Sequence, residues 1–152
     1  MKYLLIEFEE EEYWIEVGTD GYALRQIIVD KDKNVHVSCL EDCLAEGIID
    51  ENELDGTIKF ITQHDFNTNW KKVTQNKRKL WKSQKMKYPI GERIQFKVEY
   101  LYPQGWILKV EDLIGIYGDE FNLSYGQLVT GRVIGYDDIN MWLRISDLNY
   151  VD

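Results

Sequence analysis

The sequence predicts a chain of two folded parts. An α+β N-terminal module of antiparallel strands with a short helix is joined by a basic amphipathic helix to an all-β five-stranded barrel. Three observations predict this. Short apolar runs separated by turn residues fill the first part, apolar side chains then recur at helical spacing, and closely spaced strands with intervening glycines follow. We place the module at 1–62, the helix at 63–88 and the barrel at 89–152.

The composition is that of a folded globular protein. Of the 152 residues, 44% are hydrophobic and 13% aromatic, with two prolines and no low-complexity run. No apolar stretch approaches the roughly 18–20 residues that span a bilayer, and the first residues lack the core of a signal peptide. We therefore expect a cytoplasmic protein with no membrane partner.

The charge of the chain is unevenly distributed. Residues 1–70 hold 17 acidic and 5 basic side chains, residues 71–89 hold 8 basic and none acidic, and residues 90–152 hold 10 acidic and 5 basic. The net charge of −9 argues against a chain whose main task is to bind phosphates, because non-specific nucleic-acid affinity comes mostly from lysine and arginine. Three regions of different charge therefore follow one another along the chain.

Strand patterns dominate the N-terminal module. The acidic run Glu9–Glu12 separates two apolar segments and predicts the turn of a hairpin, and a turn-forming cluster at 30–34 separates two more strands. The expected strands are residues 2–9, 13–17, 22–30, 35–38 and 57–61.

A short helix is expected between the last two of these strands. Ser38 and Glu41 have the spacing of a capping box, in which each side chain bonds a backbone amide of the first turn. Leu40, Cys43 and Leu44 would then share one buried face, and Gly47 would end the helix in the left-handed conformation.

The connecting helix is predicted to be long and basic. Thr62 and Asp65 indicate its start, and Tyr88-Pro89 its end. Its apolar stripe comprises Phe66, Trp70, Val73, Leu80 and Trp81, and its candidate binding cations are Lys71, Lys72, Arg78, Lys79 and Lys82. Three interpretations stay open: a connector whose charge balances the acidic module, a strip that contacts phosphates, or a docking element for an acidic partner.

The last third resembles the S1 branch of the OB folds. The expected strands are residues 93–102, 105–111, 113–117, 128–136 and 141–146. The resemblance rests on a strand that opens with Gly91 and reaches Val98, a turn at Gly105, a second glycine-initiated strand from Gly126, and the aspartate turn before Ser146. It implies a five-stranded S1-like barrel.

That family binds RNA with aromatic, histidine and arginine side chains on one face of the barrel. Tyr117 falls where the family often has its histidine, and Asp137 matches the aspartate of the turn. Gln104 and Ile107 occupy the positions of the two stacking aromatics, and Trp142 stands near the position of the arginine. The resemblance gives four candidate binding residues on the barrel: Trp106, Tyr117, Asp137 and Trp142.

Segments of the N-terminal module, including 24–30, 38–47 and 66–70, resemble bacterial domains without an assigned function. No activity follows from that resemblance.

Metal binding and catalysis are not expected. His36, Cys39, Cys43 and His64 are ligand types that zinc accepts, but no Cys-x-x-Cys pair is present and both cysteines fit a packing role, as reduced thiols. Adjacent carboxylates such as Asp137 and Asp138 in turns are usually solvated. No nucleophile elbow, phosphate loop or dinucleotide motif occurs. The sequence therefore predicts no catalytic residue, no metal and no cofactor.

We interpret the sequence as that of a non-enzymatic binding or adaptor protein of bacterial type, whose S1-like barrel binds RNA or a protein. The alternative is an acidic inhibitor or immunity-type protein that binds a basic protein partner through charge complementarity.

Overall fold

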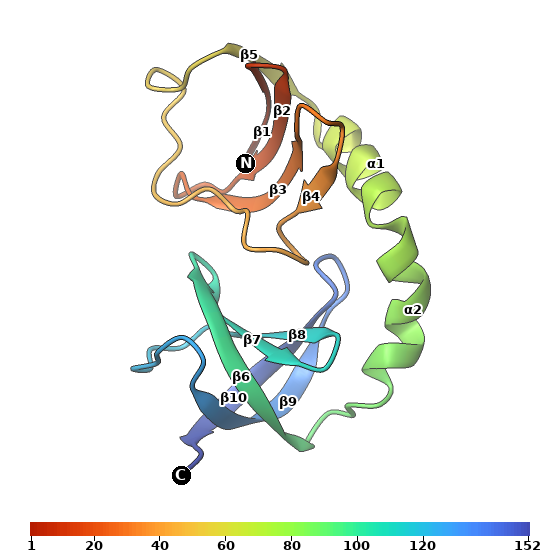
Figure 1. Cartoon of the computed structure of the whole chain (residues 1–152), viewed down its shortest axis with the longest axis vertical. Coiled ribbons are helices and arrows are strands. Elements are labelled where there is room, and N and C mark those ends of the chain that lie inside the picture. The colour runs from red at the N-terminus through yellow and green to blue at the C-terminus, as the bar shows by residue number, and fades with distance from the viewer. The chain divides into compact units, whose positions relative to one another are not determined.

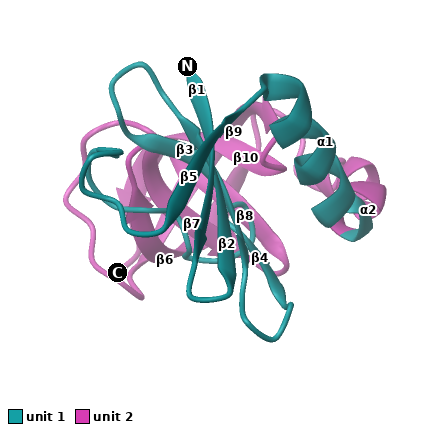
Figure 2. Cartoon of the chain, turned by 90° about the horizontal axis from the view of Figure 1, so that it is seen from above, with its two compact units in different colours: residues 1–76 teal, residues 77–152 magenta.

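The computed structural model describes residues 1–152 and confirms the predicted fold class, an antiparallel sheet with two helices followed by a closed five-stranded barrel (Figure 1). The chain forms two compact units, unit 1 (Met1–Asn76) and unit 2 (Lys77–Asp152) (Figure 2). The division falls inside the helical region, which we expected from the sequence to be a separate connecting part. No helix is both long enough and apolar enough to span a membrane.

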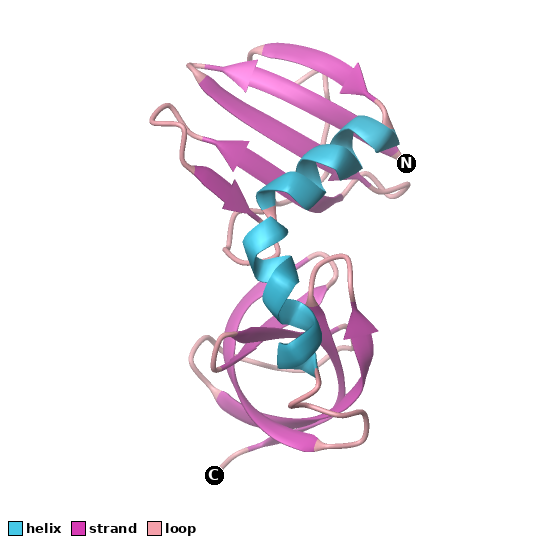
Figure 3. Cartoon of the chain, turned by 90° about the vertical axis from the view of Figure 1, so that its right-hand side faces the viewer, coloured by secondary structure: helices cyan, strands magenta, loops and turns pink.

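Unit 1 is a five-stranded antiparallel sheet in the order β4-β3-β2-β1-β5, with one helix lying across it (Figure 3). Its elements are β1 (Lys2–Phe8), β2 (Glu11–Val17), β3 (Ala23–Val29), β4 (Val35–Val37), β5 (Thr57–Ile61) and α1 (Gln63–Val73). The predicted hairpin is present, and its two-residue turn consists of Glu9 and Glu10, both with positive φ. Such turns match the twist of the strands that they join.

The helix predicted from Ser38 to Gly47 is wrong, because the segment forms only turns and bends. The hydroxyl oxygen of Ser38 accepts a hydrogen bond from the backbone of Gln26 in β3 (2.9 Å), so it does not cap a helix. The Gln26 side chain in turn accepts a bond from the backbone N–H of Ala45 (2.7 Å). These two bonds attach the segment to the sheet, and Leu40, which was expected to be buried, is 41% exposed.

The predicted long helix is two helices. Thr62 and Asp65 form the expected capping box, so α1 begins where the sequence indicated. The hydroxyl of Thr74 donates to the carbonyl oxygen of Trp70 (2.7 Å), a bond that bends helices, and α2 (Gln75–Lys85) starts one residue later. Phe66 and Trp70 are buried as predicted.

A buried ion pair connects the sheet of unit 1 to α1. The guanidinium of Arg25 donates two hydrogen bonds to the carboxylate of Glu16 (2.8 Å each) and one to the side-chain oxygen of Asn67 in α1 (2.8 Å). It also lies over the rings of Phe66 and Trp70, at 4.8 and 5.1 Å from their centroids. Both charged side chains are only 7% exposed, so each needs the other.

We predict that Arg25→Met destabilises unit 1 by about 3–5 kcal/mol, because it leaves the Glu16 carboxylate buried without its partner. The double variant Arg25→Met/Glu16→Met should recover most of that loss, since an apolar pair of similar volume replaces both charges. Urea unfolding followed by tryptophan fluorescence measures both. If the single and double variants were equally unstable, the conclusion that buried Glu16 depends on Arg25 would be contradicted.

His36 is held between two carboxylates. Its Nδ1 lies 2.8 Å from Glu41 Oε2, and its Nε2 lies 3.1 Å from Asp30 Oδ2. The hydrogen bond to Asp30 is the main cause that raises the pKa of His36, followed by the bond to Glu41. The same bond lowers the pKa of Asp30. The protonated ring thereby joins β4 to the turns on either side of it.

We expect unit 1 to lose stability as the pH rises through the raised pKa of His36. A raised pKa in the folded state means that the stabilisation is complete below the ordinary pKa of about 6.5 and disappears above the folded value. Proton NMR should show His36 titrating above the ordinary value of about 6.5. Urea unfolding of His36→Gln should lose the alkaline decline, and His64→Gln, at an exposed site on α1, should keep it.

Unit 2 contains most of α2 and a closed barrel of β6 (Arg93–Tyr102), β7 (Gly105–Val110), β8 (Leu113–Tyr117), β9 (Leu128–Asp137) and β10 (Trp142–Tyr150). Around the barrel the order is β10-β8-β7-β6-β9, with β8 and β10 parallel and the other pairs antiparallel. The barrel is consistent with an OB fold. Glycines at positions 115 and 131 leave room for Ile145, which a Cβ at either position would meet at 3.0 Å or less.

Candidate functional site

The structure does not bring the four predicted barrel residues together on one open face. Tyr117 and Trp142 are buried, at 6% and 2% exposed, and Trp106 is half-buried. Trp106 and Tyr117 are cross-strand partners, so they share one face of the sheet. Trp142 pairs with Ile114, which precedes Tyr117 by three residues on β8. Because side chains alternate between the two faces along a strand, the side chain of Trp142 lies on the face opposite to that of Tyr117.

Each buried aromatic has a partner within unit 2. The ring of Tyr117 packs edge-on against Phe121, with centroids 6.0 Å apart, and burial is the main cause that raises its pKa. The ring of Trp142 lies 6.2 Å from that of Tyr102. Neither ring offers the open stacking surface that the resemblance implied.

Asp137 stabilises its own turn. One carboxylate oxygen accepts from the backbone N–H groups of Ile139 and Asn140 (3.0 and 3.1 Å), and the other accepts from the Asn140 side chain (3.0 Å). The turn between β9 and β10 depends on these bonds, and Met141 completes it with a positive φ of 61°. The structure thus explains Asp137 without a ligand.

The predicted cations of the helical region divide between the two units. Lys71 and Lys72 lie on α1 in unit 1, and Arg78, Lys79 and Lys82 lie on α2 in unit 2. The four lysines are exposed, whereas Arg78 is half-buried and its charge contributes to lowering the pKa of Asp138. Leu80, assigned to the apolar stripe, is 54% exposed.

Trp81 and Lys85 attach α2 to the barrel. The carboxylate of Asp138 accepts from Trp81 Nε1 (2.7 Å) and from Lys85 Nζ (2.8 Å), and the bond from Lys85 is the largest cause that lowers its pKa. The Lys85 ammonium also lies over the rings of Trp81 and Tyr136, 5.6 and 5.2 Å from their centroids. This attachment leaves Lys79 and Lys82 facing the solvent.

We predict that Asp138→Ala speeds hydrogen exchange in α2 without speeding it in the barrel strands, because it removes the acceptor that Trp81 and Lys85 share. Mass spectrometry of deuterated fragments measures this. The matched variant Glu120→Ala, which removes an exposed carboxylate from the loop between β8 and β9, should leave α2 unchanged. Unchanged protection in Asp138→Ala would overturn the assignment.

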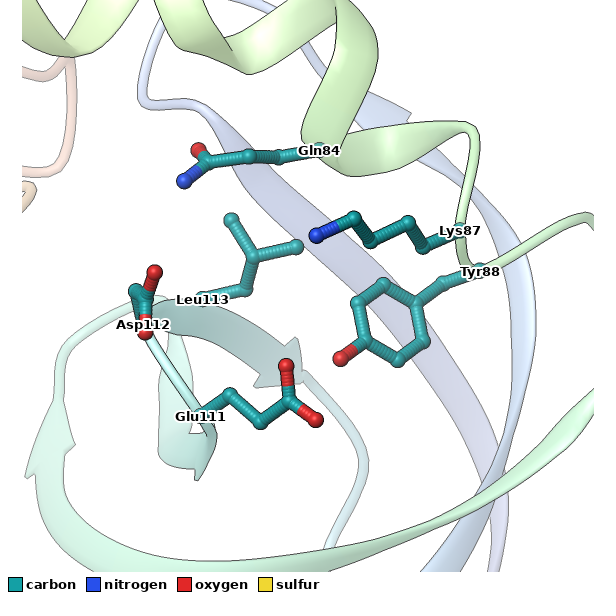
Figure 4. Close-up of a pocket in the computed structure, with 6 residues that line it drawn as sticks. All are labelled: Gln84, Lys87, Tyr88, Glu111, Asp112 and Leu113. Atoms are coloured by element: carbon teal, nitrogen blue, oxygen red, sulfur yellow. The ribbon is translucent and has the colours of Figure 1, made fainter.

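A small cavity lies beneath the connection from α2 to β6 (Figure 4). Its volume is about 10 Å³, the space of roughly one water molecule. It is lined by Gln84, Lys87, Tyr88, Glu111, Asp112 and Leu113. Burial is the main cause that raises the pKa of Tyr88, and a hydrogen bond with Glu111 adds to it. The polar groups position the connection and leave no space for a larger ligand.

A larger hollow of about 260 Å³ opens on β8, β9 and β10. It is lined by Gln104, Ile116, Gly118, Asp119, Ile134, Arg144, Ile145 and Ser146. Arg144 is exposed and suits an anion, but Asp119 on the same rim opposes one. The hollow therefore fits a phosphate less well than the pair of exposed lysines Lys97 and Lys109 does.

Two lysines face each other on the outside of the barrel. Lys97 in β6 and Lys109 in β7 are cross-strand partners, and both are exposed. The ion pairs of unit 2 engage Lys85, Arg93 and Arg132, and neither Lys97 nor Lys109 takes part in one. Like charges directly opposite each other destabilise a sheet. Folding alone therefore does not account for this pair.

An exposed tyrosine lies next to the two lysines. The ring of Tyr125 is 75% exposed, and the Lys97 ammonium lies 5.8 Å from its centroid. Two backbone hydrogen bonds of 2.8 Å join Val98 to Gly126 and Gln127, so the loop holds Tyr125 beside β6. Leu128, the partner of Lys97 on β9, is 43% exposed. We define Lys97, Lys109, Tyr125 and Leu128 as the lysine–tyrosine patch.

Sequence reasoning missed this patch because its members are spread over residues 97–128 and come from β6, β7, β9 and the loop before β9. A basic residue beside an exposed aromatic is the signal of a nucleic-acid surface, but it appears only once the strand register is known.

The cysteines and histidines do not assemble a site. No group of three or more His, Cys, Asp and Glu side chains has the arrangement of a metal centre. Both cysteines are free thiols, and burial raises the pKa of Cys43 to about 12, which keeps the thiol protonated. A protonated thiol is a poor nucleophile and a poor metal ligand.

No family model and no curated protein matches the chain. Among solved structures, it is similar to a multidomain protein with nucleic acid binding domains from Streptococcus pneumoniae TIGR4, with 12% identity and a TM-score of 0.33. The similarity covers 95% of this chain and 49% of the other, so the chain spans about half the length of that structure.

Proposed function

We propose that the chain is a non-catalytic binding protein whose barrel unit binds single-stranded RNA at the lysine–tyrosine patch. The observation that carries the proposal is the pair Lys97 and Lys109, opposed on adjacent strands with no carboxylate to neutralise them. A phosphate group bound between them would relieve their repulsion. An RNA base stacked on Tyr125 would add about 1–3 kcal/mol, with little dependence on sequence.

The net charge of −9 does not oppose this proposal. Unit 1 holds 17 acidic and 7 basic side chains, a net charge of −10, whereas unit 2 holds 10 acidic and 11 basic, a net charge of +1. The excess negative charge thus belongs to unit 1. Lys79 and Lys82 on α2 add two exposed cations to unit 2 that further phosphates could use.

We expect fluorescence anisotropy with a single-stranded RNA oligomer to show binding that weakens between about 50 mM and about 200 mM salt. Lys97→Gln/Lys109→Gln should weaken binding at least about tenfold at low salt and reduce the salt slope by about 1.4, the value for two phosphate contacts on a single strand. Tyr125→Ala should weaken binding about 5- to 150-fold with an unchanged slope, because stacking does not release ions.

The matched control is Lys31→Gln/Lys33→Gln, which removes two exposed lysines from the turn between β3 and β4 of unit 1. It should leave RNA affinity unchanged. Lys79→Gln/Lys82→Gln tests whether α2 contributes to the site. The proposal is wrong if RNA does not bind at low salt, or if the control pair weakens binding as much as the patch pair.

The alternative from the sequence, an acidic inhibitor of a basic protein, is supported by the charge of −10 on unit 1. It predicts tight association with a cationic protein that does not depend on Lys97 or Lys109. The variants above therefore separate the two functions.

A further inference from the structure

Strand β5 forms an open edge of the sheet in unit 1. It pairs only with β1, and β4, which has three residues, forms the opposite edge. Proteins usually protect such edges with prolines, bulges, charged side chains or very short strands. The five residues of β5 contain no proline, and their register with β1 is continuous. Two of the usual protections, a proline and a bulge, are therefore absent from β5, and Lys59 is its one charged residue.

The side chains of β5 make this edge apolar on one face. Phe60 is 68% exposed although it lies on the same face as the buried Leu4, its partner on β1. Ile58, two residues earlier on the same face, is half-exposed. Lys59 points to the opposite face, where its ammonium is paired with Glu7 (3.2 Å). Lys59 is 57% exposed, and its pairing with Glu7 leaves no net positive charge on that face.

The surroundings of β5 are acidic. A Cβ added to Gly56 would lie 2.3 Å from the carbonyl oxygen of Glu7, so the start of β5 is packed directly against the end of β1. That packing places Asp55 close to the turn of Glu9 and Glu10. All three carboxylates are exposed, and none forms an ion pair within unit 1.

We propose that β5 is a docking edge for an extended segment of a basic protein, which adds to the sheet as a sixth strand. Backbone hydrogen bonds would supply affinity, Phe60 and Ile58 would cover alternate apolar side chains of the segment, and basic side chains would face the acidic turn. The partner segment thus alternates apolar and basic residues.

A second copy of the chain fits this edge poorly. Each copy of unit 1 carries a net charge of −10, and an antiparallel pair of β5 strands centred on its middle residue would place Lys59 opposite Lys59. Charge complementarity therefore selects a basic segment over self-association.

The test titrates the full-length, ¹⁵N-labelled protein with a synthetic peptide of alternating lysine and valine, followed by NMR. Shifts of backbone amides should concentrate in β5 and β1 and not in β4. Phe60→Thr should weaken binding at least about tenfold, because it removes the apolar cover while keeping a good strand former. The matched control Val35→Thr, at a position 44% exposed on the opposite edge, should bind the peptide as the parent does.

Two further peptides decide between strand addition and mere charge attraction. The same peptide with alternate amides N-methylated keeps its charge and loses backbone donors, and it should bind at least about tenfold more weakly. A glutamate–valine peptide should not bind. The proposal is overturned if the N-methylated peptide binds equally well, if Val35→Thr weakens binding as much as Phe60→Thr, or if the protein alone forms a dimer that Phe60→Thr dissociates.

Discussion

The bulge in β6 decides which side chains the barrel presents to the outside. Between Val98 and Tyr100 the register of β6 with β7 shifts by one residue. Tyr100 pairs with Ile107, but Val98 pairs with Leu108, so β6 holds one extra residue between these two pairs. Without the shift Lys97 would face Val110. With it Lys97 faces Lys109, and the unneutralised pair that carries the proposed function arises.

This dependence on one extra residue explains why the strands were predictable and the site was not. Period-two patterns and glycines located all five barrel strands, and the capping box at Thr62 located the start of α1, because each signal lies within a few neighbouring residues. Which face a side chain occupies depends on register, which is a property of two strands together. Trp142 illustrates the point: its place in the sequence fits an exposed binding position, yet it is 2% exposed.

The helix expected at Ser38 failed for a related reason. Its capping box has the right residues at the right spacing, and a local rule cannot detect that Gln26, twelve residues earlier, offers the Ser38 hydroxyl another partner. Glu41, the other half of the box, contacts His36 instead. Hydrogen bonds to β3, together with turn bonds such as that from the Glu41 N–H to the Val37 carbonyl oxygen (3.0 Å), thus hold the segment in turns instead of a helix. The cost of leaving sheet donors without acceptors makes this outcome reasonable.

The net charge of the whole chain conceals a difference between its two units that matters for their partners. An average of −9 describes neither unit, since unit 1 carries −10 and unit 2 carries +1. Electrostatic attraction acts over about 8–10 Å at physiological salt, so each surface responds to its own neighbouring charges more than to the total. A chain of this kind is able to offer an anion-binding patch on the barrel and an acidic edge on the sheet, for partners of opposite charge.

The ionisable groups with shifted pKa values also bear on the proposal that the chain is not an enzyme. Catalytic sites collect such groups in a cleft, where burial and neighbouring charges prepare them for proton transfer. Here each carboxylate or histidine with a shifted pKa has a structural partner of its own: His36 with Asp30, Glu51 with Lys2, and Asp138 with Lys85. They stabilise a turn, a terminal strand and a helix, and none of these pairs lines the hollow on the barrel. Interactions within the folded units therefore account for these shifted pKa values, but they do not account for the opposed lysines Lys97 and Lys109. For this reason we assign the proposed function to the barrel surface.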